Sequence, residues 1–286
     1  MLLAGAAGVG KSMLAIELAY ELAHGTKAFG AYDVVRPLRV AYVQLELVPD
    51  QLQGRFKAVQ SVYGETDGVF QASPKEFVLP SREERLVEAL KKREIEVVIL
   101  DPMYLMLAGG ELSLSEVRPF LDSVNRVRSE TGCVAIILAH TKKVQWDSSG
   151  RAVDMGFDAI SGHRAFANWA DTIALVGQRG SGIRLDWAKH RNTKHPENLK
   201  PINFLRTKGL PFVNEDSPYS KAVNGSEKVK IVTYLQAHGP TFRSDLSRAL
   251  PDIPATTLAR AVQDCIDTGM VTEETKGRRS LLSVGG

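Results

Sequence analysis

A short glycine-rich stretch near the start of the chain is typical of phosphate-binding loops. Residues 5–12 read Gly-Ala-Ala-Gly-Val-Gly-Lys-Ser, which matches the pattern G-x-x-x-x-G-K-S. Glycines let the backbone turn tightly so that its N–H groups surround a phosphate, and a helix starting there adds partial positive charge. Lys11 is expected to reach the β- and γ-phosphates, and the Ser12 hydroxyl to ligate Mg²⁺. The residues predicted to bind ATP are Gly5, Ala6, Ala7, Gly8, Val9, Gly10, Lys11 and Ser12.

Two carboxylates follow apolar runs and are candidates for metal binding and catalysis. Asp101 closes the run Val97–Leu100, the form of a Walker B strand whose aspartate helps to hold Mg²⁺, commonly through water. The alternative is an aspartate that caps a helix. Glu46 follows the run 40–45, where a carboxylate would orient and deprotonate the attacking water. A solvated glutamate at a strand end is the alternative for Glu46, and the sequence leaves both interpretations open.

Three further polar residues lie at the ends of later apolar runs. His140 ends the run Cys133–Ala139, where it would contact the γ-phosphate and report its presence; a structural histidine is the alternative. Lys189 and Arg191 lie at the end of a strand-like run late in the domain. If that strand is at an edge, both cations would project toward a neighbouring subunit and neutralise charge on the transferring phosphoryl group. An ordinary basic edge strand that discourages aggregation is the alternative.

Basic residues in two regions are candidates for nucleic-acid contact. The stretch 141–157 combines cations with an aromatic side chain, which suits single-stranded DNA through phosphate contacts and stacking, although it also fits a solvated loop. Residues 225–286 contain eight Lys and Arg against seven Asp and Glu, so this part favours protein contact as much as duplex DNA. The candidates are Lys142, Lys143, Trp146 and Arg151 in the first region, and Arg260, Lys276, Arg278 and Arg279 in the second.

The pattern of apolar residues predicts the elements that position these side chains. Strand-like runs alternate with helical periods through residue 140, which indicates crossover units and a mostly parallel sheet covered on both faces. In such sheets ligands bind beyond the carboxyl ends of the strands, where the glycine-rich loop, Glu46, Asp101 and His140 all fall. Two helices are predicted to start at capping boxes, Ser81 with Glu84 and Ser113 with Glu116. Strand-like runs resume at 172–176, 183–187 and 201–205.

The chain is predicted to contain two domains. Residues 1–216 form an α/β P-loop domain, and residues 217–225, with Pro, Ser, Asn and Gly, are interpreted as a linker. Residues 226–286 contain three helical periods and a closing hairpin that turns at Lys276–Gly277, which suggests a small winged-helix domain.

Composition excludes several protein classes. The 286 residues are 44% hydrophobic and 24% charged with a net charge of +3, as in a globular protein, so any argument for nucleic acid must be local. Cys133 and Cys265 lack metal-ligand spacing and indicate buried thiols in a reducing compartment. The apolar start lacks a basic segment and is interrupted by Lys11, unlike a signal peptide. With no stretch apolar enough to span a membrane, we expect a cytoplasmic protein without a membrane partner.

With these positions in hand, residues 1–204 resemble a RecA-fold ATPase of the ring-forming helicase group. The chain is similar to plasmid RepA-type and DnaB-type replicative helicases and to RepA-like AAA ATPases. The resemblance implies a P-loop at Gly5–Ser12, a catalytic glutamate at Glu46, a Walker B aspartate at Asp101 and a polar sensor at His140. The segment 188–192 is similar to the lysine and arginine finger that such helicases insert into the adjacent ATP site.

The resemblance implies a motor that assembles as a homo-oligomeric ring, with a hexamer as the expected size. ATP would bind between subunits with Mg²⁺, and hydrolysis would drive movement on single-stranded DNA in replication. The winged helix would hold duplex DNA or a replication protein. Two other functions stay open: an ATP-dependent regulatory or DNA-binding switch that unwinds nothing, and a recombinase or recombination mediator.

Overall fold

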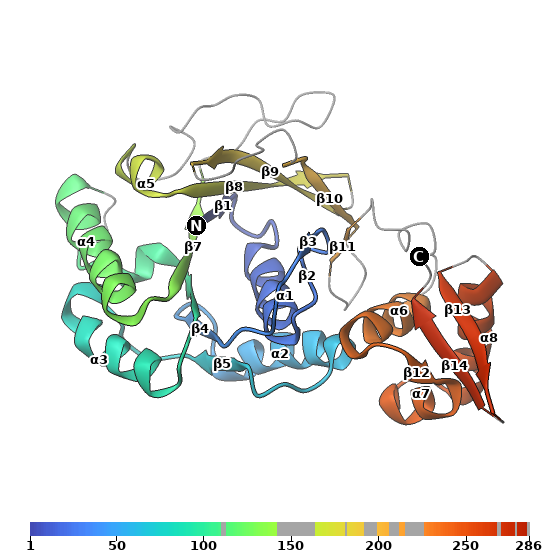
Figure 1. Cartoon of the computed structure of the whole chain (residues 1–286). Helices are drawn as coiled ribbons and strands as arrows, with labels where there is room; N and C mark the ends of the chain where they lie inside the picture. The colour runs from blue at the N-terminus through green and yellow to red at the C-terminus, as the bar shows by residue number, and fades with distance from the viewer. Residues whose placement is uncertain are drawn as a thin grey trace.

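A nine-stranded sheet is the centre of the ATP-binding part of the chain (Figure 1). The computed structural model describes residues 1–109, 113–141, 164–180, 182–191, 199–205, 212–214, 226–267, 270–277 and 279–284. The strands are ordered β11-β10-β9-β8-β1-β7-β6-β4-β5. Neighbours from β5 to β8 run parallel, and β9, β10 and β11 are added antiparallel. The predicted α/β class with a mostly parallel sheet is confirmed.

The helices and strands up to β11 have the following bounds: β1 Leu2–Gly5, α1 Lys11–His24, β2 Lys27–Ala28, β3 Tyr32–Asp33, β4 Val40–Gln44, α2 Pro49–Tyr63, β5 Val69–Ala72, α3 Leu79–Lys92, β6 Val97–Asp101, the 3-10 helix η1 Met103–Met106, α4 Leu114–Thr131, β7 Val134–His140, α5 Arg164–Trp169, β8 Thr172–Arg179, β9 Gly182–His190, β10 Ile202–Leu205 and β11 Val213–Asn214. The strands and helices expected from apolar periodicity are all present. The β2–β3 hairpin, the strands β5 and β11 and the short helix α5 were not predicted.

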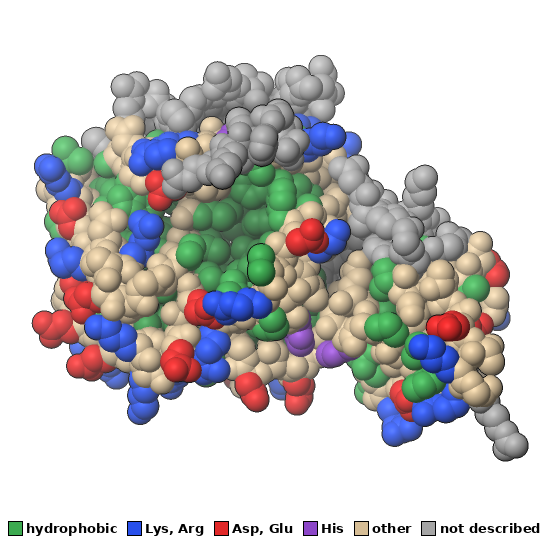
Figure 2. All heavy atoms as spheres, in the orientation of Figure 1, with side chains coloured by type: hydrophobic (Ala, Val, Ile, Leu, Met, Phe, Trp, Pro, Cys, Tyr) green, Lys and Arg blue, Asp and Glu red, His purple; other side chains and the backbone are tan. Residues whose placement is uncertain are grey.

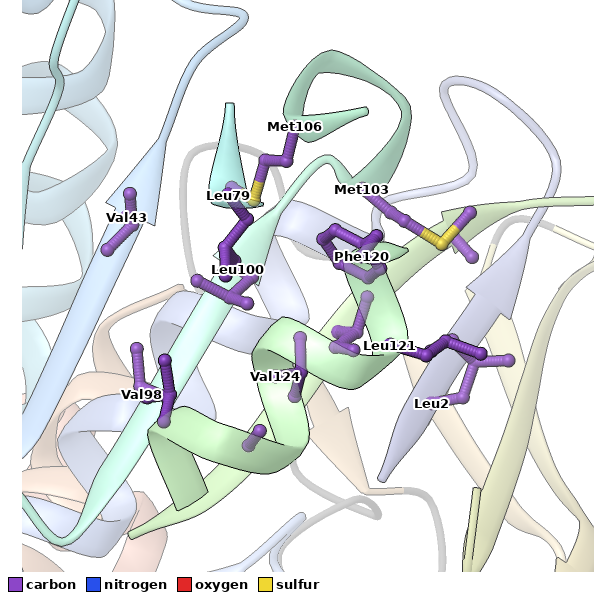
Figure 3. Packing of buried hydrophobic residues seen from close by; sticks show 14 of the residues in the cluster. Leu2, Val43, Leu79, Val98, Leu100, Met103, Met106, Phe120, Leu121 and Val124 are labelled. Atoms are coloured by element: carbon purple, nitrogen blue, oxygen red, sulfur yellow. The ribbon is translucent and has the colours of Figure 1, made fainter. Parts of the chain in front are cut away.

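Two apolar layers enclose the sheet because its central strands are buried on both faces. Along β1, Leu2 and Ala4 pack into one layer with α3, α4 and α5, while Leu3 packs into the other with α1 and α2. This division follows from side chains alternating across a strand. Figure 3 shows the first layer, where Phe120 of α4 and Met103 lie beside the sheet. The double cover fixes the carboxyl ends of the strands.

Glycines end two helices as predicted, but the predicted capping boxes are wrong. Gly25 and Gly132 follow α1 and α4 with φ of 67° and 72°, a left-handed conformation that favours glycine. Helix α3 begins at Leu79, before Ser81, whose hydroxyl donates to the Val78 carbonyl. Ser113 is the N-cap residue of α4 but makes no side-chain cap.

The other member of that second predicted box is also engaged elsewhere. The carboxylate of Glu116 accepts a hydrogen bond from the N–H of Gly109 at 2.7 Å. A contact with the preceding loop has therefore replaced the reciprocal bond that a capping box requires.

The C-terminal residues form a separate apolar cluster with its own small sheet. The elements are α6 Ser226–His238, β12 Thr241–Phe242, α7 Arg243–Ala249, α8 Ala255–Asp267, β13 Val271–Lys276 and β14 Arg279–Val284. The sheet order is β12-β14-β13, and the helices pack on it through residues such as Leu235, Leu246 and Val262. The three expected helices and the hairpin are present, and β12 is an addition.

Histidines lie where this C-terminal part contacts α1 and α2 (Figure 2). The rings of His24 and His238 meet edge to face with centroids 5.6 Å apart, and Tyr234 packs on His238 at 4.3 Å. Burial lowers the pKa of both histidines, and the charge that His238 can carry lowers the pKa of His24 further. A neutral pair of rings therefore packs at this junction. In the described part of the chain, no helix has the length and apolarity needed to cross a bilayer.

Candidate active site

The glycine-rich loop connects β1 to α1 and depends on glycine at defined positions. A Cβ atom on Gly5 would lie 2.4 Å from the carbonyl oxygen of Val176 on β8, so no other residue fits between the strands there. Gly8 and Gly10 have φ of 72° and 114°, which strains other residue types. Helix α1 begins at Lys11, and its first N–H groups therefore face the loop. This geometry is the one that binds a phosphate.

Lys11 is buried under the loop and contacts the loop's own carbonyl groups. Its Nζ donates to the carbonyl oxygens of Gly5 and Ala6, both at 2.9 Å, and lies 3.4 Å from Nδ1 of His140. Burial lowers the pKa of Lys11 to about 8, although the carboxylates of Asp101 and Glu46 oppose this shift. A cation that is poorly solvated and held by weak partners is well prepared to bind an anion.

Asp101 ends β6 next to the start of α1, and its side chain is almost fully buried. Gln44 of β4 is its register partner, and the hydroxyl of Tyr42 donates to its Oδ2 at 2.6 Å. Burial raises the pKa of Asp101, whereas hydrogen bonds from Tyr42 and Ser12 lower it. The predicted pairing of Ser12 with this carboxylate therefore has a geometric basis.

Glu46 lies two residues beyond β4, in an exposed bend at the same edge of the sheet. Its charge acts on the pKa values of Lys11, Asp101 and His140, which places its carboxylate close to all three groups. Its exposure gives it access to water, as a general base for water activation requires. The structure thus brings together Glu46, Asp101 and the loop, as the sequence predicted.

His140 ends β7 directly beside the loop, where it pairs in register with Gly5. Burial and the Lys11 charge lower the pKa of His140, so its ring is neutral near pH 7. The ring of Tyr104, from η1, lies 5.5 Å from it between centroids. Thr141 follows, and its N–H donates to the carbonyl of Gly5 at 3.0 Å. His140 is therefore fixed against both the loop and Lys11.

The oxygen atoms at this edge suit ATP with Mg²⁺. Gln44 Oε1 and Thr141 Oγ1 are buried, and neither has a hydrogen-bond partner among the described residues. Mg²⁺ prefers oxygen ligands and usually takes only one or two carboxylates, with phosphates and water as its other ligands. In keeping with this, the described ranges contain no group of three or more His, Cys, Asp or Glu side chains placed to hold a metal. Ser12 and Asp101 would supply the protein ligands.

Lys189 and Arg191 lie at the end of β9, away from the loop's own residues. Nζ of Lys189 donates to the carbonyl of Ala167 at 2.6 Å, and Nη2 of Arg191 donates to that of Asn168 at 2.9 Å. Arg191 also pairs with Asp171 at 3.3 Å. Both cations are thus attached to α5 and the turn after it.

The expectation that this strand is an edge strand is wrong for its first half. Strand β10 pairs with residues 183–185 of β9, so β9 lies inside the sheet there. Within the described ranges, residues 187–190 pair only with β8, so the end that carries Lys189 has one open side. The Arg191 side chain is 53% exposed, which leaves its guanidinium accessible despite the bond to Asp171.

The predicted nucleic-acid residues fall into two groups. Lys142, Lys143, Trp146, Arg151 and Arg278 lie outside the described residues. Arg260 is exposed on α8, and Lys276 pairs with Glu274 at 3.7 Å. Arg279 stacks on the ring of Phe242 at 4.0 Å and donates to Ser244 Oγ at 2.8 Å and to Asp245.

Charges of both signs are interspersed over the visible face of the C-terminal part, without a large basic patch (Figure 2). Arg279 is already paired, so Arg260 and Lys276 are the described cations that remain most available. The charge pattern on this face therefore does not favour duplex DNA over a protein partner.

Sequence reasoning missed four polar residues of the site: Tyr42, Gln44, Tyr104 and Thr141. Alternation along β4 carries a signal for two of them, because Tyr42 and Gln44 share a face and Asp101 lies opposite Gln44. Polar side chains on a wholly buried strand, close to its carboxyl end, are typical of a site. Tyr104 and Thr141 depend on packing that no local pattern reveals.

Comparisons with known proteins agree with this geometry. A family model described as an AAA domain matches residues 1–145, just over half of the 286 residues. Among solved structures, the ATPase domain of a DnaB-like helicase is similar, with a TM-score of 0.55 and 13% sequence identity over 74% of this chain and 83% of that one. At this identity the likeness concerns the fold alone, and a search of curated proteins finds no match. The chain belongs to the AAA domain family of ATPases and has a RecA-like fold.

Proposed function

We propose that this protein is an ATP-hydrolysing, helicase-type motor that assembles as a ring and moves on single-stranded DNA. The observation that carries the proposal is the convergence of Lys11, Asp101 and Glu46 at the carboxyl ends of β1, β6 and β4. A phosphate-binding cation, a buried carboxylate and an exposed carboxylate are the groups that phosphoryl transfer to water needs. Membership of an ATPase family supports the same reaction.

Each residue has a role that follows from its contacts. The Lys11 ammonium would exchange the carbonyls of Gly5 and Ala6 for β- and γ-phosphate oxygens, which are stronger partners because they are charged. Mg²⁺, held through Ser12 and Asp101, would neutralise charge on the phosphates. Glu46, which faces solvent, would take a proton from the attacking water. His140 would sense the change because Lys11 leaves its ring.

Ring assembly supplies the step that a single subunit lacks. Lys189 and Arg191 would act on the ATP site of a neighbouring subunit and stabilise charge in the transition state. The partial exposure of Arg191 and the open side of β9 beside Lys189 support this role. Their bonds to α5 would hold both cations in a fixed position on the surface until the neighbour docks.

A non-unwinding ATP-dependent switch is the second candidate. The pairing of Arg279 with Asp245 and the mixed charge of the C-terminal part favour a protein partner for that region. In this case the C-terminal part, interpreted as a winged helix, would carry the nucleotide state of the ATPase to a partner.

Mixing two inactive variants tests whether the site is completed by a neighbour. Lys11→Ala should abolish turnover by loss of phosphate binding, and Arg191→Ala should abolish it by loss of the finger. If Arg191 acts in trans, equal mixing should restore roughly a quarter of the intact interfaces, because one subunit supplies the loop and its neighbour the arginine. Arg36→Ala, which removes a surface cation paired with Glu96, is the control variant.

The outcomes separate the candidates. Recovery of ATP hydrolysis on mixing, together with strand displacement by the wild type, would support the motor. Full activity of Arg191→Ala would contradict the finger role. Hydrolysis without strand displacement, in a wild type whose mass shows a ring, would favour the switch. A protein that retains no ATP would refute both.

A further inference from the structure

A buried tyrosine connects the phosphate-binding loop to the carboxylate at the end of β6. The hydroxyl of Tyr42 lies 2.6 Å from Oδ2 of Asp101 and 3.3 Å from the carbonyl oxygen of Ser12. One hydroxyl carries one proton, and the shorter contact to a carboxylate takes most of it. Tyr42 therefore donates to the side chain of one predicted metal ligand and touches the backbone of the other.

The sheet explains how Tyr42 reaches this position. Tyr42 and Gln44 point to the same face of β4, and Gln44 is the register partner of Asp101. Tyr42 thus lies diagonally from Asp101 on the adjacent strand, a distance that an aromatic side chain spans. The ring of Phe56 from α2 meets the ring of Tyr42 edge to face, with centroids 5.6 Å apart. Packing between the helix and the strand fixes the direction of the hydroxyl.

Burial makes this hydrogen bond important for the carboxylate. Tyr42 has no exposed surface and Asp101 is 3% exposed, so water does not replace a lost donor. A buried carboxylate without donors favours its protonated form, which is a poor metal ligand. The Tyr42 hydroxyl occupies Oδ2 and leaves Oδ1 free to face the phosphates and their metal.

We propose that Tyr42 is a positioning residue for the metal site, which orients Asp101 through Oδ2 and ties it to the Ser12 end of the loop. The inference rests on the proposed ATP and Mg²⁺ site and deepens it. Its action is indirect, since Tyr42 touches the carboxylate rather than the nucleotide. Donors of this kind around metal ligands set the direction and basicity of the ligand.

Removal of one oxygen atom tests the role. In Tyr42→Phe the ring and its contact with Phe56 stay, and the hydrogen bond to Asp101 is lost. Bound Mn²⁺ is measured by electron paramagnetic resonance in protein saturated with a non-hydrolysable ATP analogue. We expect about tenfold weaker Mn²⁺ binding in the variant, the usual scale for such outer contacts. Affinity for the analogue in EDTA should stay within about twofold of the wild type, because Lys11 and its phosphate contacts are untouched.

Tyr63→Phe is a matched control for the loss of a buried hydroxyl. Tyr63 is also buried and donates to a buried carboxylate, Oε1 of Glu21, at 3.2 Å, but toward the end of α1 that is remote from the loop. Both variants lose a comparable hydrogen bond, about 1–3 kcal/mol of stability. Only Tyr42→Phe should change the binding of Mn²⁺, so a general loss of stability is separated from a loss of positioning.

A second background shows whether Tyr42 acts through Asp101. In Asp101→Asn, which keeps the shape of the side chain, the further change Tyr42→Phe should have no additional effect on Mn²⁺. Equal Mn²⁺ affinity of Tyr42→Phe and the wild type, or equal losses in both backgrounds, would overturn the inference. Tyr42→Met, which also lacks a donor, replaces the phenylalanine variant if that one does not fold. A wild type that binds no analogue would refute the proposed function instead.

Discussion

Binding of ATP should depend on pH because of the burial of Lys11. Burial lowers the pKa of Lys11 to about 8 in the protein without nucleotide, whereas charged phosphate oxygens would hold the ammonium in its protonated form. Above pH 8 the neutral amine must therefore take up a proton as ATP binds. The fraction of competent protein at pH 9 is about one tenth, so ATP affinity should be about tenfold weaker than at pH 7.

Calorimetry measures this linkage directly. ATP is titrated in EDTA at pH 7 and pH 9, in two buffers that differ in ionisation enthalpy, and the difference in heat gives the protons taken up. About one proton should enter per ATP at pH 9 and far fewer at pH 7. Lys11→Arg is the control, because a guanidinium stays charged at both values and should give no uptake from this position, whatever its affinity.

The same shift affects the stability of the unbound protein. The pKa of Lys11 is lower in the folded chain than the 10.5 of an exposed lysine, so the unfolded chain binds more protons between about pH 8 and 10.5. The contribution of Lys11 to stability therefore rises with pH across that window. Constant ATP affinity from pH 7 to 9, with no proton uptake, would refute the burial argument for Lys11.

Two other predictions concern buried groups outside the loop. Burial raises the pKa of Glu21 to about 7, so the folded chain binds more protons than the unfolded chain between about pH 4.5 and 7, and stability should fall as pH rises there. Glu21→Gln should remove a fall on the order of 3 kcal/mol, seen as a smaller difference in melting temperature between pH 5 and pH 8; equal differences would contradict it. Gly64 has φ of 88°, and a Cβ there would lie 2.4 Å from Nε2 of His238. Gly64→Ala should therefore speed hydrogen exchange in α6, and adding His238→Ala should reverse part of this; unchanged exchange would show that the junction adapts.

Several features of the site follow from local sequence alone. The spacing of Gly5, Gly8, Gly10 and Lys11 fixes a phosphate-binding loop because the tight turn and the helix start are formed by adjacent residues. Asp101 is placed at a strand end by the four apolar residues before it, and Glu46 by a similar run. Parallel strands then bring their carboxyl ends to one edge, so grouping them required only the sheet class.

Other features could not be read from neighbouring residues. The edge strand β5 and the β2–β3 hairpin are too short to show a period, and Ser81 entered α3 because Leu79 and its neighbours pack on the sheet. Packing overrides local capping when it buries more apolar surface. The partners of Lys189 and Arg191 on α5 likewise join residues about twenty positions apart.

The sequence by itself determined that a triphosphate-binding loop opens an α/β domain, since covalent neighbours and strand periodicity suffice for that. Only the tertiary structure decided which groups meet at the loop. The strand order sets β1 between β7 and β8, and it sets Tyr42 one strand away from Asp101. Such contacts depend on how distant segments share one buried face, and the free energy that fixes them comes from packing between those segments rather than from either one alone.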